Sequence, residues 1–180
     1  MQLEAILRSP KMQRWLGAAI LAVIAVLLGR FDGPGQRGGP VPNGPVEGQV
    51  RFIDGDSFFL GNDEVRLKGI DAPEGRQTCR RAGQDWRCGE DARRELQGLI
   101  AGQRVTCRVS ERDQHGRMLG YCTAGERDLN RGMVASGMAV SYGDYLREET
   151  AARIARLGLW GSEFKRPRDW RRRNGIGLGH

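Results

Sequence analysis

A run of fourteen apolar residues near the N-terminus, WLGAAILAVIAVLL, most constrains what this chain can fold into. The run extends from Trp15 to Leu28 and follows a basic stretch that contains Arg8, Lys11 and Arg14. A basic stretch followed by an apolar core of this length is typical of an export signal. We expect residues 15–31 to form an uncleaved signal anchor, because the following GRFDG is a poor cleavage context. A cleaved signal peptide and a buried core helix are the alternatives.

The next segment is rich in Gly, Pro and polar residues. Residues 32–48 read DGPGQRGGPVPNGPVEG and offer almost nothing to pack, which predicts a mobile tether. A folded domain is predicted over residues 49–164, with a basic tail over residues 165–180. Because the basic residues precede the apolar run, residues 1–14 should stay cytoplasmic. The domain would then be extracytoplasmic, in a periplasm or at the cell surface, or secreted if the signal is cleaved.

All four cysteines fall inside the predicted domain: Cys79, Cys88, Cys107 and Cys122. An even number behind an export signal favours two disulfides in an oxidising compartment. Zinc is the alternative, but the short knuckle of a typical zinc site is missing. Positions 107 and 122 are symmetric about a turn-like sequence at residues 113–116, so they would face each other across a hairpin, close enough to bridge. Cys79 would then pair with Cys88.

Strand-like segments precede the helical ones. Residues 48–60 and 64–70 read as strands, with a turn at Gly61-Asn62. Helical patterns follow over three segments, at residues 89–101, 129–138 and 145–160. This order predicts the α+β class, mainly β, with a small barrel and helices packed outside it.

Acidic residues gather around the two predicted strands. Asp54 and Asp56 are two positions apart on a predicted strand, so both carboxylates should point to one face. Asp71 and Glu74 follow the next strand at a proline turn that can bring them to the same rim. Such a group of carboxylates suits a hard divalent cation with oxygen ligands.

Positive charge dominates the chain, with a net charge of +7 and a pI near 9.8. This surplus favours a polyanionic partner such as nucleic acid. Arg66 and Arg117 can supply forked donors to a phosphate. Only two histidines are present, which excludes a His-cluster metal site.

Five strings occur in the order and spacing of one family: DGDS, VRLKGIDAPE, DQHGRMLGY, LNRGMVASGMA and ARLGLW. Together they resemble the thermonuclease (staphylococcal-nuclease-like) family, over about residues 49–160. The resemblance implies a five-stranded OB-type barrel with about three helices. It also implies an endonuclease that hydrolyses DNA and RNA with calcium.

The resemblance assigns roles to particular residues. Metal ligands would be the Asp56 and Asp71 carboxylates and the main-chain carbonyl of Ala72. Three residues would be catalytic: Arg66 and Arg117, which bind phosphate, and Glu74, the general base or water-orienting carboxylate. Ala72 stands where the best-known members have Thr, so a hydroxyl is lost while the carbonyl remains.

Two further regions bear on substrate binding. Gln114-His115 stands where the best-known members have Lys and Tyr, and His115 is interpreted as a turn residue. Tyr142 and Tyr145 fall in the tyrosine region that lines the family's nucleotide pocket, although they could equally be surface or core aromatics. In the tail, Trp170 is interleaved with basic residues, which suits backbone binding with base stacking, whereas a solvated tail is the alternative.

The resulting hypothesis is a monomeric, calcium-dependent endonuclease that leaves 3′-phosphate ends. Its partners would be DNA and RNA, with single strands favoured and no sequence preference, and the membrane through the N-terminal helix. The alternative is a non-catalytic extracytoplasmic OB-fold module that binds nucleic acid without cutting it.

Overall fold

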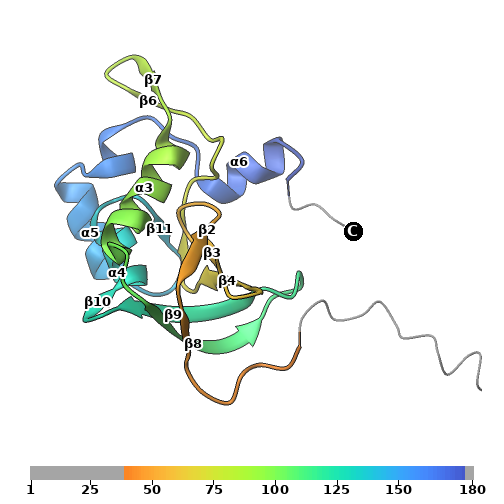
Figure 1. Cartoon of the computed structure of the whole chain (residues 1–180). Helices are drawn as coiled ribbons and strands as arrows, with labels where there is room; N and C mark the ends of the chain where they lie inside the picture. Colours follow the sequence, from red (N-terminus) through yellow and green to blue (C-terminus); the bar gives the residue numbers. More distant parts are fainter. Residues whose placement is uncertain (1–38, 177–180) are drawn as a thin grey trace, which may run out of the picture. The chain divides into compact units, whose positions relative to one another are not determined.

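Strands β1 (Val46–Gly48) and β2 (Val50–Phe52) lie at the two edges of one seven-stranded sheet, and a single residue separates them along the chain. The sheet order is β1-β8-β9-β4-β3-β2, with β10 paired to β9. Because the two edges are joined by one residue, the sheet curls into a nearly closed barrel (Figure 1). The computed structural model describes residues 39–176.

The other strands of this sheet are β3 (Ser57–Leu60), β4 (Asp63–Leu67), β8 (Val105–Arg112), β9 (Met118–Ala124) and β10 (Arg127–Asp128). Neighbouring strands are antiparallel except β4 and β9, which run parallel. Two small pairs lie outside the barrel. They are β5 (Ile70–Asp71) with β11 (Val140–Ser141), and β6 (Cys79–Arg81) with β7 (Gln84–Trp86).

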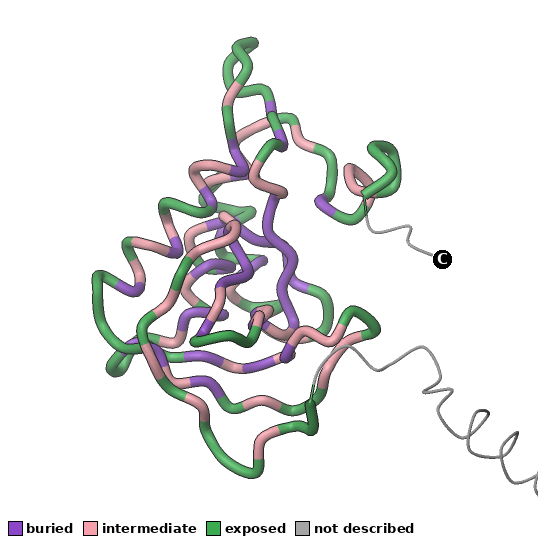
Figure 2. The backbone as a smooth tube through the Cα atoms, turned by 45° about the vertical axis from the view of Figure 1, so that its right-hand side comes forward, coloured by how far each residue is buried: buried purple, intermediate pink, exposed green. Residues whose placement is uncertain are grey.

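The barrel interior is filled by inward-facing apolar side chains, because alternate strand residues point to the same face. Phe58, Val65 and Met118 from three strands are at most 1% exposed. In Figure 2 the buried positions line the inside of the barrel and the helix faces turned toward it. The predicted mixed α+β class and barrel are confirmed.

Four α-helices occur within the described residues: α3 (Cys88–Ile100), α4 (Leu129–Ala135), α5 (Leu146–Ile154) and α6 (Pro167–Arg173). The first three correspond to the predicted helical segments. The third segment ends earlier than predicted, because Arg156 takes a left-handed φ of 53° and a 3₁₀ turn, η1 (Gly158–Gly161), follows. Helix α6 is additional. It begins with Pro167, whose fixed φ suits the first helical position, inside the segment predicted as a tail.

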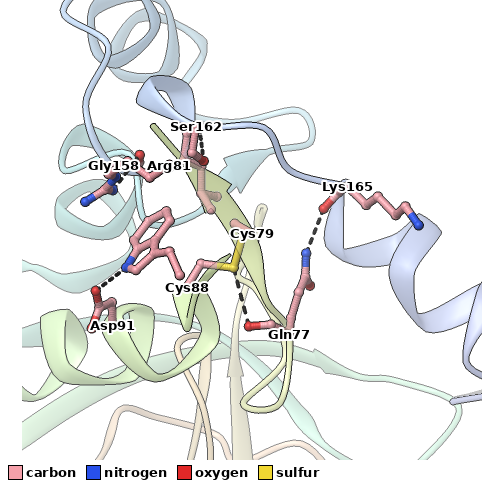
Figure 3. The surroundings of a disulfide bond; sticks show 10 residues. Gln77, Cys79, Arg81, Cys88, Asp91, Gly158, Ser162 and Lys165 are labelled. Atoms are coloured by element: carbon pink, nitrogen blue, oxygen red, sulfur yellow. Dashed lines mark hydrogen bonds between the residues drawn. A yellow bond between two sulfur atoms is a disulfide. The ribbon is translucent and has the colours of Figure 1, made fainter. Parts of the chain in front are cut away.

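Both predicted disulfides are present, and together they pair all four cysteines of the chain. Cys107 and Cys122 are directly opposed in the β8–β9 ladder, as the symmetry of the hairpin predicts. Cys79 bridges Cys88 and so joins the β6–β7 hairpin to the start of α3 (Figure 3).

The predicted N-terminal segments, residues 1–14 and 15–31, lie outside the described residues. Within residues 39–176, no helix is both long and apolar enough to cross a bilayer. Strand β1 pairs with β8 before position 49, so barrel structure begins inside the segment predicted as a linker.

Candidate active site

Arg66 joins the two carboxylates that the sequence marks as metal ligands. It lies on β4, and its Nη2 donates to Asp56 Oδ2 at 3.0 Å and to Asp71 Oδ1 at 2.6 Å. The three side chains are nearly buried, with exposed fractions of 12% for Arg66, 4% for Asp56 and 7% for Asp71. Since both carboxylates bond to one nitrogen atom, their oxygens converge on a single point.

Asp54 and Asp56 lie in a turn rather than on the strand that the sequence predicted, but their carboxylates remain close enough that the Asp54 charge helps to raise the pKa of Asp56. Residues 53–56 form the turn between β2 and β3, where alternation no longer sets side-chain direction. Asp54 Oδ1 accepts from Ser57 Oγ at 2.7 Å and from the Asp56 amide at 3.2 Å, so it stabilises this turn. Asp56 points to Arg66 and also accepts from the Ala72 amide at 2.9 Å.

The electrostatics of the two acids follow from their burial. Desolvation raises the pKa of Asp56 to about 6, although the Arg66 charge opposes the increase. Burial likewise raises the pKa of Asp71, against the hydrogen bond from Arg171 and the charge of Arg66. The carboxylates of Asp56 and Asp71 raise the pKa of Arg66 and keep it charged.

Glu74 is held by its backbone at the start of α3. Its carbonyl accepts from the Gln77 amide at 2.7 Å. A Cβ on Gly89 would lie 1.9 Å from that carbonyl oxygen, so only glycine allows the helix to approach this closely. The Glu74 side chain is 20% exposed and faces Asp71 across a shared partner, Arg171.

Arg171 is the residue that the sequence reasoning did not place here. Its Nη1 donates to Asp71 Oδ1 at 2.8 Å and to Glu74 Oε1 at 2.7 Å, and its Nη2 donates to Asp71 Oδ2 at 3.1 Å. It lies on α6, the last helix of the described residues. Pro167 at the helix start and a cluster of arginines in the last turn were the available signals for this helix.

Arg117 lies in the same cleft but outside the carboxylate cluster. It follows the β8–β9 turn, and its Nε donates to Asp113 Oδ2 at 2.8 Å. Asp113 Oδ1 also accepts from the amides of His115 and Arg117, which confirms that His115 is a turn residue. Glu64 lies 3.8 Å from the Arg117 guanidinium.

The two candidate tyrosines are separated. Tyr142 follows β11, is 55% exposed and lines the cleft with Arg66. Tyr145 packs against the main core and lines a smaller hollow with Tyr121 and Arg131. Burial raises the pKa of both phenols.

A cleft of about 1360 Å³ brings these groups together. One side carries Arg66, Asp71, Glu74 and Arg117, and the wall formed by α6 carries further arginines. Those arginines are Arg166, Arg168, Arg171 and Arg172. The cleft is therefore lined by buried carboxylates at its base and by guanidinium groups around them, an arrangement that suits an anion bound beside a cation.

The donor set fits a hard cation. Asp56 and Asp71 offer carboxylate oxygens, the ligand type that such an ion prefers, and these oxygens converge on the Arg66 guanidinium. Ala72 follows Asp71 directly and is buried, with its amide directed at Asp56. In residues 39–176 the acids are not gathered into a group of three or more His, Cys, Asp or Glu side chains around one point. Arginine side chains lie between them and neutralise them instead.

Comparisons with known proteins agree with this geometry. Residues 64–162 match the family described as "Staphylococcal nuclease homologue". The chain is 34% identical to "Succinoglycan biosynthesis protein ExoI" of Rhizobium meliloti, over 85% of this chain and 82% of the other. It is 32% identical to an "Uncharacterized endonuclease" of Escherichia coli, over 67% of this chain and 81% of the other. It is 33% identical to "Probable staphylococcal-like nuclease CAN2" of Oryza sativa, over 65% of this chain and 31% of the other.

Proposed function

Because this chain belongs to the staphylococcal nuclease family and is a nuclease of the hydrolase class, we propose that it hydrolyses phosphodiester bonds of DNA and RNA in the cleft described above. The observation that supports this most directly is the Arg66–Asp56–Asp71 cluster at the base of a cleft that also holds Glu74 and Arg117. A phosphodiester is an anion that repels nucleophiles, so a site that cleaves it must neutralise charge and place water in line.

The arginines supply charge at the phosphoryl group. Only Nη2 of Arg66 is used in the two carboxylate bonds, so its other N–H groups can donate to phosphate oxygens. Asp113 orients Arg117 from behind and fixes its guanidinium at the cleft wall. In the transition state both arginines stabilise the additional negative charge on the phosphoryl oxygens.

Glu74 is the group that acts on water. Its carboxylate lines the cleft next to Asp71, where it can accept a proton from the attacking water. The water oxygen bonds to phosphorus, the bond from phosphorus to the 5′ oxygen breaks, and the 5′ oxygen takes up a proton from solvent. The products are a 3′-phosphate end and a free 5′ hydroxyl.

Calcium is the proposed cofactor. Asp56, Asp71 and the carbonyl of Ala72 would hold it, and it would supply Lewis-acid polarisation of the phosphoryl oxygens. The residues proposed as ligands fit this ion because the atoms they offer are all oxygens, from two carboxylates and one main-chain carbonyl.

Partners and location are part of the same proposal. The arginines of the cleft would bind the phosphate backbone rather than base edges, so binding should be independent of sequence, with single strands entering most readily. We place the domain outside the cytoplasm, tethered through residues 15–31, and two disulfides agree with an oxidising compartment. A monomer is expected.

A nuclease assay on the purified full chain tests the proposal. Single-stranded DNA, double-stranded DNA and RNA are each incubated with millimolar calcium or with a chelator, and the product ends are probed with a phosphatase specific for 3′-phosphates. Cleavage with calcium alone, giving 3′-phosphate ends, is expected. Salt-sensitive binding without any cleavage would instead support the alternative, a nucleic-acid-binding module.

A further inference from the structure

Four of the six carboxylate oxygens of Asp56, Asp71 and Glu74 accept a hydrogen bond from an arginine, and both oxygens of Asp71 are among them. Arg171 covers both oxygens of Asp71 in a two-pronged pair and takes Oε1 of Glu74 as well. Asp71 Oδ1 also accepts from Arg66, so this oxygen already has two donors. A carboxylate oxygen offers two lone pairs, so Asp71 Oδ1 has no lone pair left for a cation.

The fold, rather than a free tail, brings Arg171 to this place. Gln77 Nε2 donates to the Lys165 carbonyl at 2.8 Å, just before α6 begins (Figure 3). The backbones of Arg80 and Glu163 exchange two hydrogen bonds, of 2.9 and 2.8 Å. The disulfide between Cys79 and Cys88 closes the hairpin that provides these anchors.

Among the side chains of α6, Arg171 makes the hydrogen bonds to other parts of the described chain. Pro167 at its start is buried, whereas Arg168, Arg172 and Arg173 are exposed. Arg172 pairs with Asp169 of its own helix. Figure 1 shows α6 standing apart from α3, α4 and α5. The contact between Arg171 and the carboxylates can therefore open without breaking the core.

We propose that Arg171 is an intrasteric competitor of the cation: its guanidinium holds the Asp71 and Glu74 carboxylates in the metal-free enzyme and leaves when the cation binds. The inference rests on the proposed function in one respect, that Asp71 belongs to the cation site. It also goes beyond the shared family region, because the matched residues end at 162 and α6 begins at Pro167.

The competition has a functional consequence for Glu74. While Arg171 donates to Glu74 Oε1, it occupies one of the two lone pairs of that oxygen and holds the carboxylate toward Asp71. Cation binding and release of Glu74 are then one event, because the same guanidinium engages both acids. At low calcium the C-terminal helix therefore ties the Glu74 carboxylate to Asp71 through Arg171.

Calcium titration by isothermal calorimetry, with the full chain and no nucleic acid, tests this competition. Arg171→Ala should bind calcium on the order of tenfold more tightly than the wild type, since charge-assisted hydrogen bonds that the ion must replace are gone. Arg168→Ala is the matched control, because it removes the same charge from the same helix and the same cleft. Its calcium affinity should change much less.

Each outcome decides the question. Equal affinities of the wild type and Arg171→Ala, or a gain no larger than that of Arg168→Ala, would overturn the competition. Weaker binding by Arg171→Ala would overturn it too, and would make Arg171 a positioning residue for the carboxylates. Should Arg171→Ala lose its fold by circular dichroism, Arg171→Gln provides the same comparison. If no variant binds calcium and the wild type does not cut, the proposed function itself fails.

Discussion

One nitrogen atom of Arg66 forms ion pairs with two buried carboxylates, those of Asp56 and Asp71. An ionised carboxylate in a nonpolar environment is costly unless it is paired and hydrogen-bonded. Asp56 meets this requirement through Arg66 and the Ala72 amide, and Asp71 through Arg66 and Arg171. Removing one partner of a buried pair typically costs about 3–5 kcal/mol. Tests of catalysis at Arg66 therefore need a substitution that keeps the charge.

The catalytic assignment predicts large losses from single changes. Arg66→Lys loses the forked geometry, Arg117→Ala loses a charge at the phosphate, and Glu74→Gln loses the proton acceptor. Each should lower kcat by on the order of 10²–10³ with calcium present. Cleavage of single-stranded DNA measures this, with circular dichroism to confirm folding.

The control for these variants is Arg108→Ala. Arg108 is an exposed arginine on β8 that does not line the cleft, so its removal changes the net charge by the same amount as Arg117→Ala. Its activity should stay within a few-fold of the wild type. Full activity of Glu74→Gln would contradict the role given to Glu74.

Asp113 predicts a pH-dependent contribution to stability. Burial alone would raise its pKa, but the hydrogen bond and charge of Arg117 outweigh burial and lower it below the usual 3.8. A lowered folded-state pKa stabilises the fold above the unfolded value, and this contribution is lost as the pH falls through the folded value. Asp113→Asn should lower the free energy of unfolding by about 1–3 kcal/mol at neutral pH.

Urea denaturation at several pH values checks this prediction. The difference in unfolding free energy between wild type and Asp113→Asn should be constant from pH 7 to about pH 5 and shrink below 3.8. A difference that persists or grows in acid would show that Asp113 acts through packing rather than charge.

Contacts between site residues could be predicted from the sequence only where the residues are close together in the chain. Asp71 and Glu74 are three positions apart across a proline turn, and the structure brings them to one partner, Arg171. Arg171 and Asp71 are one hundred positions apart. Nothing local in the sequence places α6 over the cleft, so this contact required the fold.

At the scale of elements, α3 determines how tightly the site loops are packed. A Cβ on Gly89 would meet the Glu74 carbonyl at 1.9 Å, and one on Gly55 would meet the Ala92 Cβ at 2.7 Å. Both contacts join α3 to the loops that carry Asp56 and Glu74. Glycine is required because the backbones approach too closely for any side chain.

Gly89→Ala should therefore disturb catalysis without removing a catalytic group. The added methyl must push Glu74 or α3 away, at a cost of about 1–3 kcal/mol in stability. A displacement of the base by about 1 Å can lower the rate on the order of 10²-fold. Single-turnover cleavage and thermal unfolding measure the two effects.

Gly98→Ala is the matched control on the same helix. A Cβ there meets nothing within 4 Å, and alanine favours helix over glycine by about 0.5–1 kcal/mol. This variant should be slightly more stable and fully active. Equal behaviour of the two alanine variants would refute the close-approach argument.

Elements with a clear hydrophobic period or with opposed cysteines could be predicted from the sequence. Strands whose ends are determined by a turn could not. The β8–β9 hairpin follows from its turn and from opposed cysteines. The DGD sequence at residues 54–56 interrupts a strand-like run, and reading through it merged β2 and β3 into one strand. Asp54 stabilises a turn there through its own side chain, a local bond that competes with strand geometry.

For the whole molecule, positive charge is concentrated on one wall of the cleft, the α6 segment, whereas the complete lining holds as many acids as arginines. The chain has a net charge of +7, and four arginines of the α6 segment line the cleft beside Arg66 and Arg117. The composition predicted a polyanionic partner. It did not predict where the arginines gather, because residues 165–180 were interpreted as a tail separate from the domain. Helix α6 makes it one wall of the site.

The charge of this wall predicts how binding responds to salt. Each arginine that neutralises a phosphate releases condensed counterions, so the logarithm of the affinity falls linearly with the logarithm of salt concentration. The Glu74→Gln background prevents cleavage during the measurement. In that background, unrelated single-stranded sequences should give the same slope, because the contacts are to backbone.

Removing Arg168 and Arg172 together should flatten that slope by about 0.7 for each phosphate of single-stranded DNA that the protein no longer neutralises. Fluorescence anisotropy at a series of salt concentrations measures the slope for both proteins. The exposed arginines Arg104 and Arg108 lie on the barrel outside the cleft, so their double alanine variant carries the same charge change and should leave the slope nearly unaltered. If both double variants flatten the slope equally, the net charge of the protein attracts the nucleic acid, and the α6 wall has no special part. If neither variant flattens the slope, α6 does not contact phosphate and its role is limited to the bonds between Arg171 and the carboxylates.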